Sequence, residues 1–275
     1  MIEHIGNTPM VTIPHKNATI LAKCEWFNPF GSSKDRAAAV MIAAAGAKKG
    51  DTVVEATSGN TGISLAAICA QLGLRCIIVM PEGMSAERMK LMKFYGAQVI
   101  LTPALDSMDG ARRIAAYIAN DCGGIYLDQF QNKANAQAHF DTTGPEIFAQ
   151  CGKAPDYFVA SVGTGGTITG AGRYLKSKNE NLQIIAVAPA AGQTIPGIGA
   201  GFWPKILDRD LIDRWMRITY ADALSAAKNS HLGCGISSGA ALHAATLLAD
   251  QPENSGKTIA VILPDSIQRY LSTLT

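Results

Sequence analysis

Short runs of hydrophobic, often β-branched residues alternate with longer, alanine-rich runs along the whole chain of 275 residues. The first kind is typical of buried strands and the second of the helices that cover them. We predict strands over residues 20–25, 52–56, 75–80, 98–101, 124–127, 157–161, 184–187 and 258–263. We predict helices over residues 37–48, 61–72, 86–95, 108–120, 168–178, 221–229 and 238–249. This alternation predicts an α/β fold with parallel sheets flanked by helices on both faces.

A polar, interrupted stretch at residues 128–139 divides the alternation, and we place a boundary between two α/β units near residues 128–145. No flexible linker separates the two units, so we expect them to share an interface. A ligand in the cleft between such units is the usual arrangement.

Composition and charge favour a small-molecule partner. With 48% hydrophobic and 17% charged residues the chain can bury a sizeable core. A net charge of +2, with no Lys/Arg run longer than two residues, gives no sign of nucleic-acid binding. Residues 1–12 lack the features of a secretory signal, and the apolar stretch 62–80 is interrupted by Gln71 and Arg75. We therefore expect a cytoplasmic protein that does not enter the membrane.

The six cysteines form no C-x-x-C pair and have no metal-ligand spacing. Several lie in apolar patterns, where a free cysteine acts as a small hydrophobic residue. We expect reduced thiols and no metal site, and a catalytic cysteine is the alternative.

Lys34 lies in the stretch NPFGSSKDR, in a predicted turn between an apolar segment and an alanine-rich helix. The loop TSGNTG, residues 57–62, follows at a strand-to-helix junction and offers hydroxyls, an amide and backbone N–H groups. A lysine that can form a Schiff base, beside a loop suited to a carboxylate, indicates pyridoxal phosphate chemistry on an amino acid. The bland alternatives are a solvated surface charge for Lys34 and a turn residue for Asn60.

Two more loops stand at predicted strand-to-helix or helix-start positions, where ligands collect in open α/β sheets. The loop GTGGT, residues 163–167, is suited to a phosphate monoester because its glycines let several N–H groups converge near a helix start. It matches no nucleotide-binding signature, and the alternative is a turn needed for tight packing. In GISSG, residues 235–239, a serine either caps the helix or contacts a pyridine nitrogen.

Further stretches, in the order IGNTP, MPEGMS, QF, TTGPEI and RYLST, extend over nearly the whole chain. Together with the loops above, they make the chain resemble the cysteine synthase (O-acetylserine sulfhydrylase) and cystathionine β-synthase family of fold type II pyridoxal phosphate enzymes. The resemblance implies a two-domain, tryptophan synthase β-like fold. A smaller mobile domain, residues 35–130, would bind the substrate carboxylate, and residues 1–34 with 131–275 would form the larger cofactor-phosphate domain.

The resemblance also implies residue roles. Lys34 would hold the cofactor as a Schiff base and then shuttle the α-proton, while Asn60 would hydrogen-bond the 3′-oxygen and Ser237 would face the pyridine nitrogen. The phosphate would be held by Gly163, Thr164, Gly165, Gly166 and Thr167. The substrate α-carboxylate would be bound by Thr57, Ser58, Thr61 and Gln129. A serine is a weaker partner for the pyridine nitrogen than a carboxylate, which favours β-elimination over long-lived carbanions.

The activity implied by the resemblance is formation of L-cysteine from O-acetyl-L-serine and sulfide, by a transferase that is expected to be a homodimer. Cystathionine β-synthase-like, cyanoalanine-forming or cysteine lyase activity are alternatives, as is a pseudoenzyme or a module that binds the C-terminal peptide of serine acetyltransferase. Two departures from the family pattern bear on the donor and the nucleophile: Ser33 stands where valine is usual, and Asp265 resembles the cystathionine synthase pattern.

Overall fold

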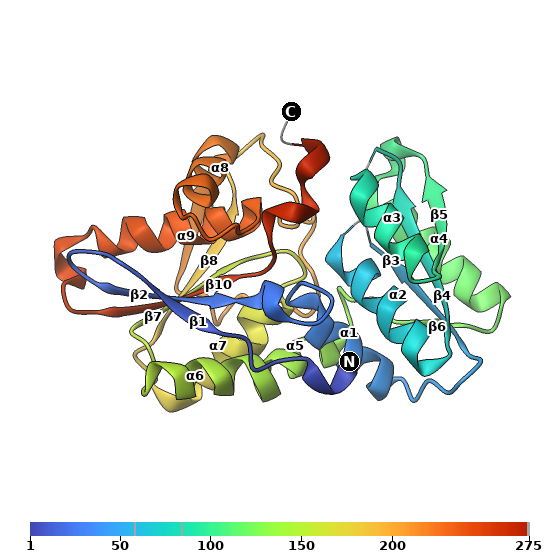
Figure 1. Cartoon of the computed structure of the whole chain (residues 1–275), viewed down its shortest axis with the longest axis horizontal. Coiled ribbons are helices and arrows are strands. Elements are labelled where there is room, and N and C mark those ends of the chain that lie inside the picture. The colour runs from blue at the N-terminus through green and yellow to red at the C-terminus, as the bar shows by residue number, and fades with distance from the viewer. Residues whose placement is uncertain (58, 84, 274–275) are drawn as a thin grey trace.

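The computed structural model describes residues 1–57, 59–83 and 85–273, and its strands form two sheets that lie side by side (Figure 1). Within these residues the larger sheet has six strands in the order β1-β2-β10-β7-β8-β9. Their bounds are β1 Met10–Ile13, β2 Thr19–Cys24, β7 Tyr157–Ser161, β8 Gln183–Pro189, β9 Arg214–Ile218 and β10 Thr258–Leu263. Only the pairing of β1 with β2 is antiparallel. The α/β prediction is confirmed.

The smaller sheet is parallel throughout, with the order β5-β4-β3-β6 among the described residues. Its strands are β3 Thr52–Ala56, β4 Arg75–Pro81, β5 Gln98–Thr102 and β6 Ile125–Tyr126. Helices α2 Asn60–Leu72, α3 Ala86–Phe94 and α4 Ser107–Asp121 pack against it. Gly73 ends α2 in the left-handed conformation, at φ +68°, which glycine adopts without strain.

Helices cover both faces of the larger sheet (Figure 1). Helices α8 Tyr220–Asn229 and α9 Ile236–Ala249 pack on one face, where Val159 and Val261 point. On the other face lie α6 Gly144–Cys151 and α7 Gly166–Lys178, against Phe158 and Ile262. Neighbouring residues of one strand thus enter opposite cores, as the pleat requires. The central strands β7 and β10 are almost wholly hydrophobic because both of their faces are buried.

Some predicted bounds were wrong. Helix α1 runs from Lys34 to Ala44, so Lys34 is its first residue and does not lie in a turn before it. The stretch 128–139, predicted to be irregular, contains helix α5 Lys133–Ala138, which begins at the cap Asn132. Strands β1 and β9 and helices α5 and α6 were not predicted, because each is short and lacks a long hydrophobic period.

The carboxyl ends of parallel strands meet at one edge of each sheet, and this places the loops of interest. Strand β2 leads toward Lys34, β7 toward Gly163 and β10 toward Asp265. In the smaller sheet β3 leads to Thr57 and its neighbour β6 toward Gln129. Two such edges that face one another form the site described next.

Candidate active site

A cavity of about 270 Å³ lies where the loops from the two sheets meet. The predicted site residues on its wall are Lys34, Thr57, Asn60, Thr61, Gln129, Gly163, Thr164, Thr167 and Ser237. Gly165 and Gly166 belong to the same loop but do not line the cavity, and Ser58 lies outside the described residues. Residues from five separate stretches of sequence therefore come together at one place.

Lys34 enters this cavity from the first position of α1. The loop before it is fastened to the end of β10, since the Ser33 amide donates to the carbonyl of Pro264 at 2.9 Å. Within the part of the chain that the structure describes, the Lys34 amine has no hydrogen-bond or ion-pair partner. Burial lowers the pKa of Lys34, against the opposing charges of Asp265 and Glu25. A larger fraction of neutral, nucleophilic amine follows.

The loop after β3 and the residue after β6 are joined by their side chains. Thr61 donates to Oε1 of Gln129 at 2.7 Å, and Nε2 of Gln129 donates to the carbonyl of Ala56 at 3.1 Å. Asn60 and Thr61 occupy the first two positions of α2, where backbone N–H groups have no partner within the helix. Such a helix start is suited to a carboxylate.

The glycine loop after β7 runs into the start of α7 and makes close contacts that exclude side chains. A Cβ atom at Gly163 would lie 2.6 Å from the carbonyl oxygen of Gly197, and one at Gly166 would lie 2.0 Å from Oδ1 of Asn135. Gly165 has φ +85°. The loop therefore needs glycine at these three positions, and it can present its N–H groups to an anion.

Two buried residues that the sequence analysis missed support this loop. Asn135 donates to the Thr164 hydroxyl at 3.1 Å and to the carbonyl of Gln129 at 2.8 Å, so it joins the two sides of the cavity. His139 lies 3.1 Å from the Thr167 hydroxyl through its Nε2 atom. Both belong to the stretch 128–139, which was predicted to be irregular. Its sequence has no helical pattern that would have predicted where these two side chains lie.

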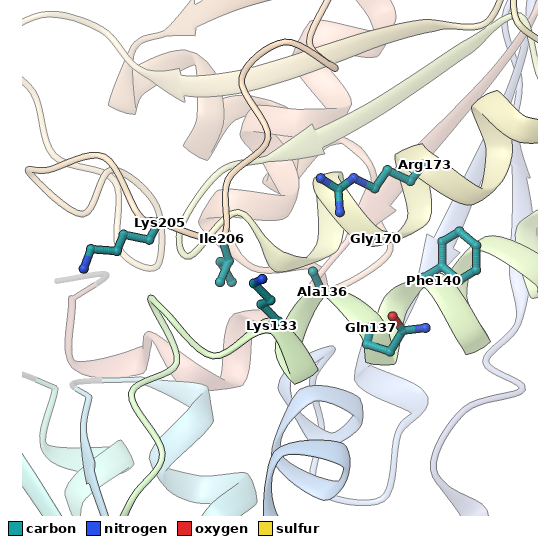
Figure 2. Close-up of a pocket in the computed structure, with 8 residues that line it drawn as sticks. All are labelled: Lys133, Ala136, Gln137, Phe140, Gly170, Arg173, Lys205 and Ile206. Atoms are coloured by element: carbon teal, nitrogen blue, oxygen red, sulfur yellow. The ribbon is translucent and has the colours of Figure 1, made fainter. Parts of the chain in front are cut away.

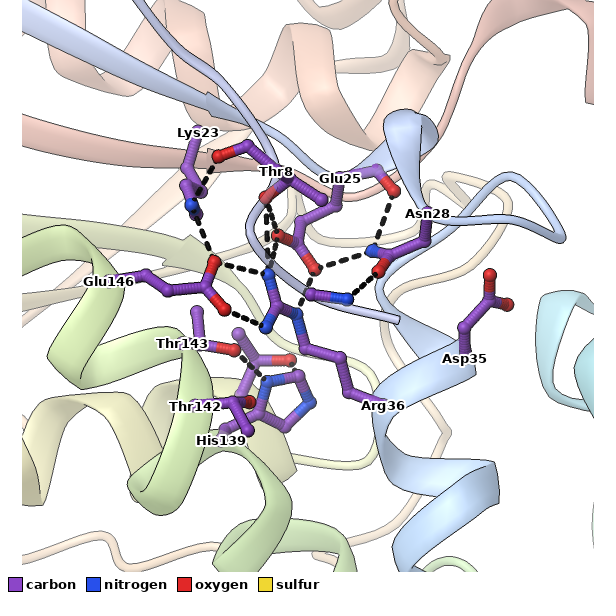
Figure 3. Close-up of polar contacts among 12 residues, drawn as sticks. Thr8, Lys23, Glu25, Asn28, Asp35, Arg36, His139, Thr142, Thr143 and Glu146 are labelled. Atoms are coloured by element: carbon purple, nitrogen blue, oxygen red, sulfur yellow. Dashed lines mark hydrogen bonds and ion pairs between the residues drawn. The ribbon is translucent and has the colours of Figure 1, made fainter. Parts of the chain in front are cut away.

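Behind Lys34, a buried network of charges fixes the start of α1 (Figure 3). The Arg36 guanidinium contacts Glu25 through Nε at 2.7 Å and Glu146 through Nη1 at 2.6 Å. Lys23 contacts Glu146 at 2.7 Å, and Thr8 donates to Glu25 at 2.6 Å. The sequence analysis gave these residues no role. The one sequence signal that could have identified them is the family resemblance, because its stretches contain Thr8, Arg36 and Glu146.

Ser237 and its neighbour do not cap their helix. Helix α9 begins at Ile236 after the cap residue Gly235, so the N-cap alternative for either serine is wrong. Ser238 instead donates to the backbone carbonyl of Asp265 at 3.1 Å. Ser237 keeps its side chain on the cavity wall. Asn60 is the first residue of a helix, so the turn alternative for it is wrong too.

A larger hollow, of about 380 Å³, lies outside this site (Figure 2). Its lining includes Lys133, Arg173 and Lys205, and none of the predicted site residues belongs to it. Arg173 is paired with Asp208 at 2.7 Å. We assign the chemistry to the smaller cavity, because the reactive lysine, the glycine loop and the helix starts converge only there.

The described residues contain no group of three or more His, Cys, Asp and Glu side chains placed to hold a metal ion, and all six cysteines are free thiols. Burial raises the pKa of Cys24 to about 12 and that of Cys151 to about 11. These thiols are poor nucleophiles, because the thiolate is the reactive form. No helix within the described part of the chain has the length and hydrophobicity needed to cross a membrane.

The chain has clear relatives among known proteins. A cysteine synthase of Staphylococcus aureus is 41% identical, over 98% of this chain and 94% of the relative. Cysteine synthase B of Campylobacter jejuni is 44% identical, over 98% of this chain and 96% of the relative. The crystal structure of an O-ureido-L-serine synthase superposes with a TM-score of 0.94 at 36% identity, and covers 99% of this chain and 93% of its own.

The residues of the cavity fit a cofactor that has an aldehyde, a phosphate and an aromatic ring. Lys34 offers an amine in a dry setting, and the loop at Gly163 offers an anion cradle that a Cβ would fill. Oδ1 of Asn60 is buried without a hydrogen-bond partner among the described residues, so a polar atom is left for a ligand. The family profile described as pyridoxal-phosphate dependent enzyme matches residues 1–265. This chain belongs to that family and is a pyridoxal phosphate-dependent enzyme.

Proposed function

We propose that this enzyme forms L-cysteine by replacing the acetate group of O-acetyl-L-serine with sulfide. The observation that carries the proposal is the convergence of Lys34, the start of α2 at Asn60 and the glycine loop at Gly163 on one cavity. The two cysteine synthases that match nearly the full length support the choice of reaction.

Bound pyridoxal phosphate supplies the electron sink that lets an amino acid lose its α-proton and its β-substituent. Gly163 to Thr167 would hold the phosphate through backbone N–H groups and two hydroxyls. Asn60 would contact the 3′-oxygen, and Ser237 would face the pyridine nitrogen. These roles agree with the positions of the side chains on the cavity wall.

Lys34 would act as the base that takes the α-proton on Nζ, because its lowered pKa favours the neutral amine. The substrate carboxylate would lie at the start of α2, with Thr57, Ser58, Thr61 and Gln129 as its partners. Gln129 is already oriented by Thr61 and Ala56, so little side-chain entropy would be lost on binding.

We also propose that residues 35–130 move as a unit against residues 1–34 and 131–275, and that this unit closes over the bound substrate. Closure would exclude water from the cavity. We further propose that the enzyme is a homodimer. We also propose that its cavity binds the C-terminal peptide of serine acetyltransferase.

A second nucleophile is supported by one observation. The superposed O-ureido-L-serine synthase has this fold at 36% identity, and its name states a product other than cysteine. Replacement with a nucleophile other than sulfide, or cystathionine-, cyanoalanine- or cysteine lyase-type chemistry, is therefore the alternative. Asp265, on the cavity wall, is the departure from the family pattern that would bear on it.

One experiment tests both the reaction and the lysine. The purified enzyme with pyridoxal phosphate is given O-acetylserine, O-phosphoserine or serine together with sulfide, and cysteine formation is measured. In a separate arm it is given cysteine without sulfide, and sulfide release is measured. We expect turnover with O-acetylserine, its loss in Lys34→Ala, and near-normal turnover in Lys133→Ala, whose lysine lines the other hollow. Borohydride reduction should leave the pyridoxyl group on the peptide that contains Lys34. Cysteine formation by Lys34→Ala, or label on another lysine, would refute the assignment.

A further inference from the structure

One carboxylate, that of Asp265, joins the two sides of the cavity. Its Oδ2 atom accepts a hydrogen bond from Nδ2 of Asn60 at 2.7 Å and another from the hydroxyl of Tyr270 at 2.7 Å. Asn60 begins α2 beside the smaller sheet, whereas Asp265 follows β10 of the larger sheet. The contact with Asn60 therefore spans the cavity between residues 205 positions apart.

The position of Asp265 is fixed by its own backbone. Its carbonyl accepts from the amide of Gly235 at 2.9 Å and from the hydroxyl of Ser238 at 3.1 Å, and it forms an isolated bridge with Ser32. A Cβ at Gly235 would lie 2.1 Å from Oδ1 of Asp265. Asp265 is 1% exposed. The carboxylate thus has little freedom to move and can orient the groups that it binds.

An ionised carboxylate accepts hydrogen bonds and cannot donate them. It therefore selects the nitrogen end of the Asn60 amide, and the oxygen end is turned away from it. That oxygen, Oδ1, is buried and has no partner among the described residues. A serine at position 265 would both donate and accept, so it would not determine which end of the amide faces it.

Tyr270 gives the carboxylate a second partner near the proposed pyridine contact. Its proton is donated to Asp265, and its pKa is raised well above the usual value by burial and then by the charge of Asp265. A side-chain hydrogen bond with Ser237 lowers the pKa of the same hydroxyl. Tyr270 does not itself line the cavity, but through it one acceptor acts on Ser237 as well as on Asn60, which both line the cavity.

We propose that Asp265 is a positioning residue that fixes, from across the cavity, which hydrogen-bonding atom Asn60 presents to the cofactor, and that it orders the hydroxyl of Ser237 through Tyr270. This inference rests on the proposed cofactor site, and it goes further by giving a role to a residue that departs from the family pattern. Asp265 itself takes no part in proton transfer.

The test is a double-mutant cycle on Asp265→Ser and Asn60→Ala, read out by the dissociation constant and absorbance spectrum of bound pyridoxal phosphate. Loss of the acceptor should weaken cofactor binding by about 10- to 100-fold, as expected for hydrogen bonds to a charged group. It should also shift the absorbance maximum, because the amide can then turn over. Asp265→Asn keeps an acceptor oxygen but adds a donor, so it should retain only part of the affinity that Asp265→Ser loses.

Coupling separates positioning from a general structural effect. If the two residues are coupled, the loss of cofactor affinity in the double variant should be smaller than the product of the losses in the two single variants, by a factor of at least about 5. In the cofactor-free chain, Asp265→Ser should speed hydrogen exchange at residues 59–64, whereas Asp141→Asn, at an exposed aspartate, should leave exchange and affinity unchanged. Multiplicative losses, an unshifted spectrum and unchanged exchange would overturn the proposal. A chain that shows the coupling but forms no cysteine would contradict the proposed reaction alone.

Discussion

His139 Nε2 lies 3.1 Å from the hydroxyl of Thr167, in the glycine loop. Its Nδ1 lies 2.8 Å from the hydroxyl of Thr143. Burial, and then the positive charge of Arg36, lower the pKa of His139 to about 3, so the ring is neutral and carries one proton. If Thr143 donates to Nδ1, the Nε2 proton goes to Thr167. The Thr167 proton is then free to point at a bound anion.

We therefore expect His139→Ala to weaken binding of pyridoxal phosphate by about 10-fold, the loss of one oriented hydrogen bond. Binding of pyridoxal, which lacks the phosphate, should change little, and the ratio of the two dissociation constants is the measurement. His139→Gln, whose amide N–H can replace the Nε2 donor, should recover part of the loss. Equal losses for both ligands would show that His139 supports the fold and not the phosphate loop.

The buried carboxyl group of Glu55 should make the free energy of unfolding fall as the pH rises toward 8. Burial, and then the negative charge of Asp128, raise its pKa to about 8, and its Oε2 atom is buried without a partner in the described structure. A carboxyl group with a raised pKa stabilises the fold fully below its unfolded value of about 4.5, and this contribution is lost as the pH rises through about 8. The cost should be about 1.4 kcal/mol per pH unit within that window.

Glu55→Gln should remove that dependence. We expect the variant to gain about 1–3 kcal/mol in free energy of unfolding relative to the wild type between pH 5 and pH 8. Urea unfolding at the two pH values measures the gain, with Glu180→Gln, at an exposed position, as the control. A pH dependence that is the same in Glu55→Gln and in the wild type would contradict the prediction.

The charge network at Arg36 should contribute strongly to stability. Arg36 is 1% exposed and contacts the fully buried Glu25. Although burial by itself raises the pKa of Glu146, the hydrogen bond and charge of Arg36 bring it to about 2. Arg36→Met would leave the buried Glu25 without its ion-pair partner and Glu146 with Lys23 alone, at a cost of about 3–5 kcal/mol. Arg173→Met breaks a surface pair with Asp208 and should cost less than about 1 kcal/mol. Chemical unfolding of both variants tests this difference.

The close approach at Gly163 gives a prediction about cofactor affinity. Because a Cβ there would lie 2.6 Å from the backbone oxygen of Gly197, Gly163→Ala must displace one wall of the cavity. We expect at least about a 10-fold rise in the dissociation constant of pyridoxal phosphate, measured by titration of the cofactor-free chain. Gly256→Asn is the matched control, since φ is +75° there, nothing lies within 4 Å of the Cβ, and asparagine tolerates this conformation. Unaltered affinity in Gly163→Ala would argue against the phosphate cradle.

Local pattern was enough for the elements with long hydrophobic runs. Strands Thr52–Ala56, Tyr157–Ser161 and Thr258–Leu263 have the predicted bounds, because both faces are buried and turn residues end each run. The start of α1 was wrong by three residues. A hydrogen bond from Ser33 to the distant Pro264 holds the chain in place there, and a local pattern does not contain it.

The sequence by itself determined the alternation of the long strands and helices, the family and the four loops that carry the chemistry, because each depends on residues that are close along the chain. Only the tertiary structure decided which polar groups support those loops. Asp265 meets Asn60, and Arg36 meets Glu146, across 205 and 110 positions of sequence. Such pairs form because parallel strands bring the ends of remote segments to one edge, where a buried polar group must find its partner.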